Sequence, residues 1–162
     1  MKLHAPPFVA AVAATVVSFL LLLSPTTSLS QHKPAGSIPA TALLQPAELA
    51  ASLNSASEPR PLILQVGSHV LYAEAHIVGS EYAGPGGQGG GLQLLRERVG
   101  KVSKDAPIVI YCGCCPWTRC PNIAPAYDEL RALGFTHVTV LYIADNFGAN
   151  WIDPGYPVDK GR

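Results

Sequence analysis

The chain has 162 residues, and its 11 lysine and arginine residues balance 11 aspartate and glutamate residues. Apolar residues make up 48% of the chain, a share that is sufficient for a buried core. The charge balance excludes the strongly basic surface of a nucleic-acid-binding protein, so we expect no nucleic-acid partner.

The first thirty residues, 1–30, have the pattern of a secretory signal peptide. Lys2 precedes an apolar stretch over residues 8–23, and Ser28-Leu29-Ser30 offers a cleavage site. We therefore expect export, to the periplasm or as a secreted protein. The alternative is a membrane anchor at 8–23, which is short for a span. The membrane is a partner only if this leader stays uncleaved.

Cleavage leaves about 130 residues, enough for one domain with its own core. Residues 31–40 contain proline, glycine and serine and are predicted to be a flexible lead-in, followed by a single domain over residues 41–162. In that domain helical and strand patterns alternate: helix 45–53, strand 62–66, short strand 77–78, helix 92–102, strand 108–111, helix 122–133, strand 138–143 and a loop-rich tail. The order predicts an α/β fold with a doubly wound parallel sheet flanked by helices.

A glycine-rich segment, Gly84–Gly91, contains the spacing G-x-G-x-x-G. A dinucleotide site needs a strand that runs directly into this turn and a helix directly after it. No clear strand pattern runs into Gly84. The segment is therefore interpreted as a surface turn, and no cofactor is expected.

All four cysteines, Cys112, Cys114, Cys115 and Cys120, fall within nine residues, directly after the strand pattern 108–111. A helix pattern follows at once. A thiol at the tip of a strand and under a helix N-terminus meets backbone N–H groups and the positive end of the helix dipole, and both stabilise a thiolate. The loop is therefore the candidate chemical site.

The chain resembles the rhodanese-like family of sulfurtransferase domains. The landmarks are Leu62-Ile-Leu-Gln-Val66, His76-Ile-Val-Gly79, Tyr111-Cys112, Leu130-Arg-Ala-Leu-Gly-Phe135, Trp151 and Gly155-Tyr-Pro-Val158. The resemblance implies a rhodanese-like doubly wound domain in which Cys112 forms a persulfide. It also implies a small sulfur-donor anion, such as thiosulfate, or a thiol acceptor as partner, and no metal.

Three further loop residues are candidates for substrate binding. Arg119 carries a positive charge that would attract an anionic donor, Gly113 contributes backbone to the loop, and Trp117 would form a wall of the sulfur pocket. The family loop runs Cys-x-x-Gly-x-Arg, whereas here Cys115 is third after Cys112 and the arginine is seventh. The family's Asp-x-Arg on the first strand is replaced by Gln65-Val66-Gly67, which removes the acid and the base that brace the pocket.

Other functions remain open. Cys114, Cys115 and Cys120 are candidate resolving thiols, and Cys112-Gly-Cys-Cys115 is a C-x-x-C motif suited to thiol–disulfide exchange through the Cys112/Cys115/Cys120 loop. A zinc or cuprous-copper site is a further alternative, although the neighbours Cys114 and Cys115 cannot easily both point inward. The last alternative is a catalytically silent binding module, because a fold does not determine a function.

Overall fold

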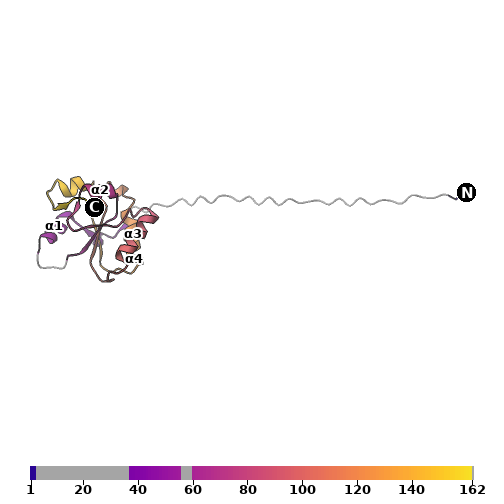
Figure 1. Cartoon of the computed structure of the whole chain (residues 1–162), viewed down its shortest axis with the longest axis horizontal. Helices are drawn as coiled ribbons and strands as arrows, with labels where there is room; N and C mark the ends of the chain where they lie inside the picture. The colour runs from indigo at the N-terminus through magenta and orange to yellow at the C-terminus, as the bar shows by residue number, and fades with distance from the viewer. Residues whose placement is uncertain (3–36, 56–59, 162) are drawn as a thin grey trace. The chain divides into compact units, whose positions relative to one another are not determined.

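The computed structural model describes residues 1–2, 37–55 and 60–161 (Figure 1). The elements are η2 (Ala40–Ala42), β1 (Leu43–Leu44), α1 (Pro46–Asn54), β2 (Leu62–Gln65), α2 (His69–Glu74), β3 (His76–Ile77), β4 (Glu81–Tyr82), α3 (Gly89–Val99), β5 (Ile108–Tyr111), η3 (Trp117–Arg119), α4 (Ile123–Ala132), β6 (Val138–Leu141), η4 (Gly148–Ile152) and β7 (Val158–Asp159).

The predicted signal peptide and most of the predicted lead-in fall on residues 3–36, outside the described residues. Within the described ranges, no helix is both long enough and apolar enough to cross a membrane.

The main sheet has five parallel strands in the order β1-β6-β5-β2-β4. Strand β5 lies in the middle, which suits its uninterrupted β-branched sequence, because a central parallel strand is covered on both faces. A second, two-stranded sheet pairs β3 with β7 in antiparallel register, Ile77 opposite Val158. The predicted α/β fold with a parallel sheet flanked by helices is confirmed.

The side chains of β5 alternate between the two faces of the sheet, as the pleat requires. Ile108 and Ile110 pack in the core that contains the buried residues of α3 and α4. Val109 and Tyr111 pack in the second core, with α1 and Trp151. Cys112, the next residue along, belongs to the first core. Its thiol therefore lies on the face of the sheet that α3 and α4 cover.

The predicted helices 45–53 and 122–133 are confirmed within one residue at each end, and local sequence explains their starts. Pro46 occupies the first turn of α1, where its missing N–H costs nothing, and Gln45 and Glu48 form a capping box. Helix α4 begins directly after Asn122, and its chain reverses at Gly134, which has a φ of 88°.

The glycine-rich segment differs from its prediction. Strand β4 ends two residues before Gly84, so a strand does precede it, and α3 begins at Gly89 and ends at Val99 rather than running from 92 to 102. Gly84 and Gly86 are buried, so this is not a simple surface turn. A Cβ atom on Gly86 would lie 2.2 Å from the carbonyl oxygen of Asn122. The glycine-rich segment packs so closely against the loop before α4 that a side chain at Gly86 would not fit.

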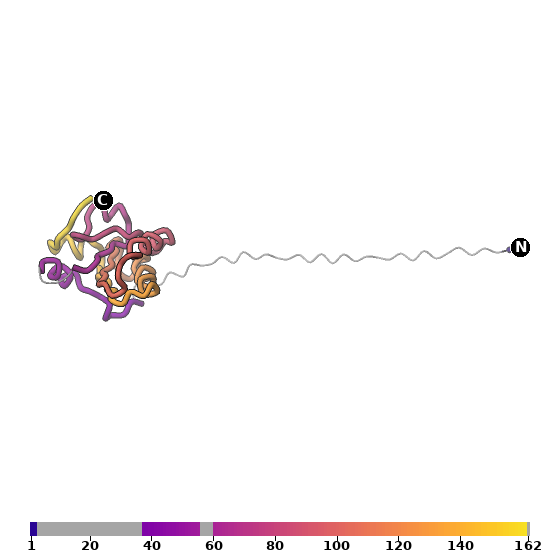
Figure 2. The backbone as a smooth tube through the Cα atoms, turned by 60° about the horizontal axis from the view of Figure 1, so that its bottom comes forward, coloured from indigo at the N-terminus to yellow at the C-terminus, as the bar shows by residue number. Residues whose placement is uncertain are grey.

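The C-terminal tail, which the sequence predicts to be rich in loops, contains regular secondary structure. It contains the π-helical turn η4 and strand β7. The buried Trp151 indole donates a hydrogen bond of 3.0 Å to the carbonyl of Pro157, and its ring contacts that of Tyr156. Figure 2 shows the yellow C-terminal segment alongside the magenta segment that contains β3. The tail thus packs beside β3 through the pairing of β7.

Candidate functional site

Cys112 lies directly after the central strand, and its side chain is buried, with 4% of the residue exposed. The residue before it anchors the end of β5. The Tyr111 hydroxyl lies 3.0 Å from the Ser80 hydroxyl and accepts a hydrogen bond of 3.2 Å from the backbone N–H of Ile77. Burial raises the pKa of Tyr111, so the ring stays neutral. The strand end that carries Cys112 is therefore firmly held.

Three sulfur atoms gather at this strand end. The Sγ atoms of Cys112, Cys114 and Cys120 all lie within 4.8 Å of one another, and we refer to them as the sulfur cluster. The Sγ atoms of Cys112 and Cys114 are only 3.0 Å apart. Cys115 Sγ lies 3.1 Å from Cys114 Sγ and faces the backbone carbonyl of Arg119 at 3.9 Å. All four thiols are free.

The backbone conformation of Gly113 allows the sulfur atoms of Cys112 and Cys114 to approach each other closely. Its φ is 72°, in the left-handed region that L side chains rarely adopt. Its carbonyl accepts a hydrogen bond of 3.0 Å from the backbone N–H of Phe147, and a Cβ atom at this position would lie 2.8 Å from the Phe147 Cβ atom. A tight turn at Gly113 therefore brings the two neighbouring sulfur atoms onto the same side.

Asn122, which the sequence analysis did not single out, connects the sulfur cluster to the glycine-rich loop. Its side-chain amide donates to Cys112 Sγ at 3.3 Å and to Cys114 Sγ at 3.7 Å. Its oxygen accepts a hydrogen bond of 3.0 Å from the backbone N–H of Gly87. The residue is buried. Its position just before a helix is the sequence signal that could have identified it, since polar side chains are favoured there.

Gln65 braces the strand end from the neighbouring strand, at the place where the family's acid is absent. Its amide nitrogen donates to the carbonyl of Cys112 at 3.3 Å and to that of Ser68 at 3.4 Å. Its oxygen accepts from the Gly67 N–H at 3.1 Å. The acid and the base are absent from these positions, and the neutral amide of Gln65 makes hydrogen bonds to the end of the strand without a charge.

The sulfur cluster concentrates negative charge on Cys114. Hydrogen bonds from Cys112 and Cys120, together with those from Cys115 and Asn122, lower the pKa of Cys114, which is also more exposed than Cys112. The hydrogen bonds that Cys112 makes with Cys114 and Cys120, and its burial, raise the pKa of Cys112. The two neighbouring thiols of the cluster therefore have pKa values that are shifted in opposite directions.

The start of α4 faces a different cysteine from the one expected. The backbone N–H groups of Asn122 and Ile123 interact with the Cys120 sulfur. Cys112 instead receives the side-chain amide of Asn122. The prediction that the helix N-terminus stabilises a thiolate at Cys112 is therefore corrected: its backbone donors act at Cys120, the third sulfur of the cluster.

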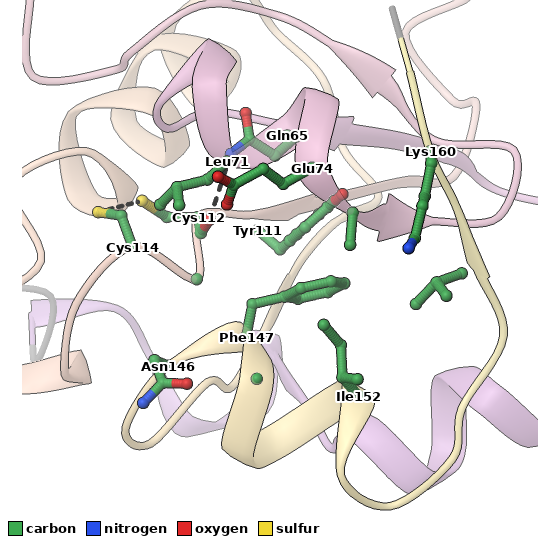
Figure 3. Close-up of a pocket in the computed structure, with 14 residues that line it drawn as sticks. Gln65, Leu71, Glu74, Tyr111, Cys112, Cys114, Asn146, Phe147, Ile152 and Lys160 are labelled. Carbon is green, nitrogen blue, oxygen red and sulfur yellow. Dashed lines mark hydrogen bonds between the residues drawn. The ribbon is translucent and has the colours of Figure 1, made fainter.

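A cavity of about 670 Å³ opens beside Cys112 and Cys114 (Figure 3). Phe147, Leu71, Ile152 and Val158 contribute apolar surface to it, whereas Glu74 and Lys160 are its charged residues. Figure 3 shows the two sulfur atoms at one side of the lining residues and Lys160 at the other. The cavity therefore places apolar side chains and two charged residues beside the cysteine loop.

The remaining predicted site residues lie in different surroundings. Gly113 lines the cavity, but Arg119 and Trp117 do not. Arg119 is exposed on η3. Trp117 is buried, its ring 5.1 Å from that of Tyr142, and it lines a narrow space behind Cys112 and Cys120. Their substrate-binding roles stay predictions, since Arg119 lies at the surface and Trp117 lies in the core.

No protein-family profile and no curated protein matches the chain. Solved structures do. The Alr3790 protein from Anabaena sp. has a TM-score of 0.57 and 24% identity, over 73% of this chain and 92% of that chain. The solution structure of the rhodanese-like domain from Alr3790 has a TM-score of 0.54 and 22% identity, over 74% and 79%. The BH2092 protein from Bacillus halodurans has a TM-score of 0.55 and 21% identity, over 72% and 75%.

Similarity to solved structures at this level of identity shows the fold of the chain. The described part of the protein therefore has the rhodanese-like fold, with a sulfur cluster in the loop that follows its central strand.

Proposed function

We propose that this domain is a sulfurtransferase or sulfane-sulfur carrier that forms a persulfide on Cys112. The observation that carries the proposal is the position of Cys112, at the end of the central strand of a rhodanese-like fold, beside a cavity and 3.0 Å from a second sulfur. Sulfur transfer requires a thiol that can attack a sulfane sulfur and then retain it.

The proposed loading step takes place at Cys112, which lines the cavity. The Cys112 thiol gives its proton to solvent, and the resulting Cys112 thiolate attacks the outer sulfur of thiosulfate. The new bond joins Cys112 Sγ to that sulfur, and the sulfur–sulfur bond of thiosulfate breaks with its electron pair leaving on sulfite. The products are the Cys112 persulfide and sulfite, so no oxidant or reductant is consumed.

The cavity supports acceptors larger than thiosulfate. Its apolar wall at Phe147 and Ile152 would contact the body of an organic thiol, and Lys160 would attract an anionic group on it. Attack of that thiolate on the outer sulfur of the persulfide would transfer the sulfur and restore Cys112. A small sulfur-donor anion and a thiol acceptor are therefore the proposed partners.

The test is the intact mass of the reduced full chain after incubation with thiosulfate, beside Cys112→Ser, Cys114→Ser, Cys115→Ser and Cys120→Ser. We expect the mass to rise by one sulfur atom in the unmodified chain and not in Cys112→Ser. Cys114→Ser, Cys115→Ser and Cys120→Ser should still take up one sulfur atom, because each of them keeps Cys112. Loading that persists in Cys112→Ser would overturn the assignment.

A second candidate function is thiol–disulfide exchange, and the same contact between Cys112 and Cys114 favours it. Attack of the Cys114 thiolate on a mixed disulfide at Cys112 would form a Cys112–Cys114 bond and release the partner thiol, without net oxidation. The pair differs from the C-x-x-C pair Cys112 and Cys115, since Cys115 is not one of the three sulfurs of the cluster. Loss of two hydrogens on mild oxidation, without sulfur uptake, would favour this function.

A further inference from the structure

We propose that the sulfur cluster, Cys112, Cys114 and Cys120, also binds one cuprous ion, Cu(I). Copper binding is a function separate from sulfur transfer. It also uses Cys120, which the proposed loading step does not need. The three sulfur atoms lie within 4.8 Å of one another, and two of them are 3.0 Å apart.

The spacing of the three sulfurs fits a single ion. An ion with metal–sulfur bonds of about 2.3 Å holds three sulfurs about 4 Å apart in a trigonal plane. One pair in the cluster is 3.0 Å apart, and none of the three separations exceeds 4.8 Å. Cys114 is partly exposed within the loop, and the site requires its side chain to rotate so that the 3.0 Å separation from Cys112 widens.

The side chain of Cys115 resolves the objection that adjacent cysteines cannot share one site. Cys115 Sγ lies 3.1 Å from Cys114 Sγ and 3.9 Å from the backbone carbonyl oxygen of Arg119, and it is not one of the three sulfurs that all lie within 4.8 Å of one another. The site therefore needs only Cys114 of the adjacent pair. Cys115 becomes a cysteine of the same loop that lies outside the ligand set, and it provides an internal control.

The ligands and their surroundings favour Cu(I) over Zn²⁺. Thiolates are soft ligands that select cuprous copper or zinc, but structural zinc takes four ligands. Around the two buried sulfurs the structure has Trp117, Ile123 and Leu141, which are apolar. Two or three thiolates satisfy Cu(I), and a dry site suits it. Coordination replaces the thiol protons, which pass to solvent, and the copper stays in its +1 state.

Donors in the surrounding structure compensate the negative charge of the bound ion and its thiolates. The Asn122 amide lies 3.3 Å from Cys112 Sγ and 3.7 Å from Cys114 Sγ. The first backbone N–H groups of α4 interact with Cys120. Cys114 lines the cavity, which gives the ion an entry path. Bound copper would occupy Cys112 and so prevent its persulfidation.

The experiment is an anaerobic Cu(I) titration of the reduced full chain in competition with bicinchoninate, a coloured Cu(I) chelator. We expect the protein to withhold one equivalent of copper. Cys112→Ser, Cys114→Ser and Cys120→Ser should each bind at least tenfold more weakly, whereas Cys115→Ser should bind as the unmodified chain does. Equal weakening in Cys115→Ser, or no copper withheld by the unmodified chain, would overturn the site.

X-ray absorption at the copper edge of the unmodified chain keeps the test independent of how the variants fold. Three sulfur neighbours are expected, and nitrogen or oxygen neighbours would overturn the inference. Preference for Zn²⁺, measured against a coloured zinc chelator, would overturn the choice of metal. If the chain binds copper but takes up no sulfur, only the proposed sulfur-transfer function is contradicted. If it takes up sulfur but binds no copper, only the copper site is contradicted.

Discussion

The side-chain amide of Asn122 donates a hydrogen bond to the Sγ atom of Cys112 over 3.3 Å, while its oxygen accepts one from the backbone N–H of Gly87. One buried residue thus connects the strand end, the cysteine loop and the glycine-rich loop. Because a side-chain amide has both donors and an acceptor, asparagine can serve the sulfur and the N–H at the same time.

The two functions of Asn122 can be separated by substitution. Asn122→Ala should lower the free energy of unfolding by about 1–3 kcal/mol, because the Gly87 N–H loses its acceptor and the sulfurs lose their donor. Asn122→Asp keeps the acceptor but places a negative charge beside the thiolate, so it should retain more stability and still load sulfur slowly. Urea unfolding and the rate of sulfur uptake provide the comparison. Equal stability losses would show that the Gly87 hydrogen bond contributes nothing.

Cys114 should be the first cysteine to react with iodoacetamide. Its pKa is lowered by hydrogen bonds from its neighbours, so its thiolate persists well below the ordinary thiol pKa of about 8.5. Alkylation of Cys114 should therefore continue as the pH falls to about 6, while Cys112, with its raised pKa, stays largely unmodified. Peptide mass spectrometry at a series of pH values measures this. In urea all four cysteines should titrate alike, and faster reaction of Cys112 in the folded chain would contradict the assignment.

Gly113→Ala should destabilise the chain and widen the contact between Cys112 and Cys114. The left-handed backbone costs about 1–2 kcal/mol for a residue with a side chain, and the new Cβ would lie 2.8 Å from the Phe147 Cβ atom. Gly134→Ala is the matched control, because Gly134 also has a positive φ but no atom within 4 Å of its added Cβ. The loss of unfolding free energy in Gly113→Ala minus the loss in Gly134→Ala measures the cost of the contact with Phe147. Equal losses in the two variants would show that Phe147 moves aside.

Tyr111→Phe should cost about 1–3 kcal/mol of unfolding free energy, because the buried N–H of Ile77 and the hydroxyl of Ser80 lose their partner. Tyr127→Phe, at a partly exposed ring on α4, should change it by less than about 0.5 kcal/mol. Thermal or urea unfolding measures both. A Tyr111→Phe loss no larger than that of the control would show that the hydroxyl does not anchor the strand end.

The sequence pattern was sufficient for the architecture because it is local. The β-branched run Ile108–Tyr111 predicts a buried strand, and the helix after Asn122 follows from its periodicity and from Gly134. Short elements were missed: β1 and β4 have two residues each, and their strand character comes from pairing with β6 and β2 rather than from their own residues.

By itself the sequence determined that four thiols share one loop at the end of a strand, since adjacency along the chain is enough for that. Only the tertiary structure decided which thiols meet. The turn at Gly113 brings Cys114 to Cys112, and Asn122 reaches both from the neighbouring loop. These contacts depend on side-chain direction and on packing between segments distant in sequence, and no local pattern encodes either.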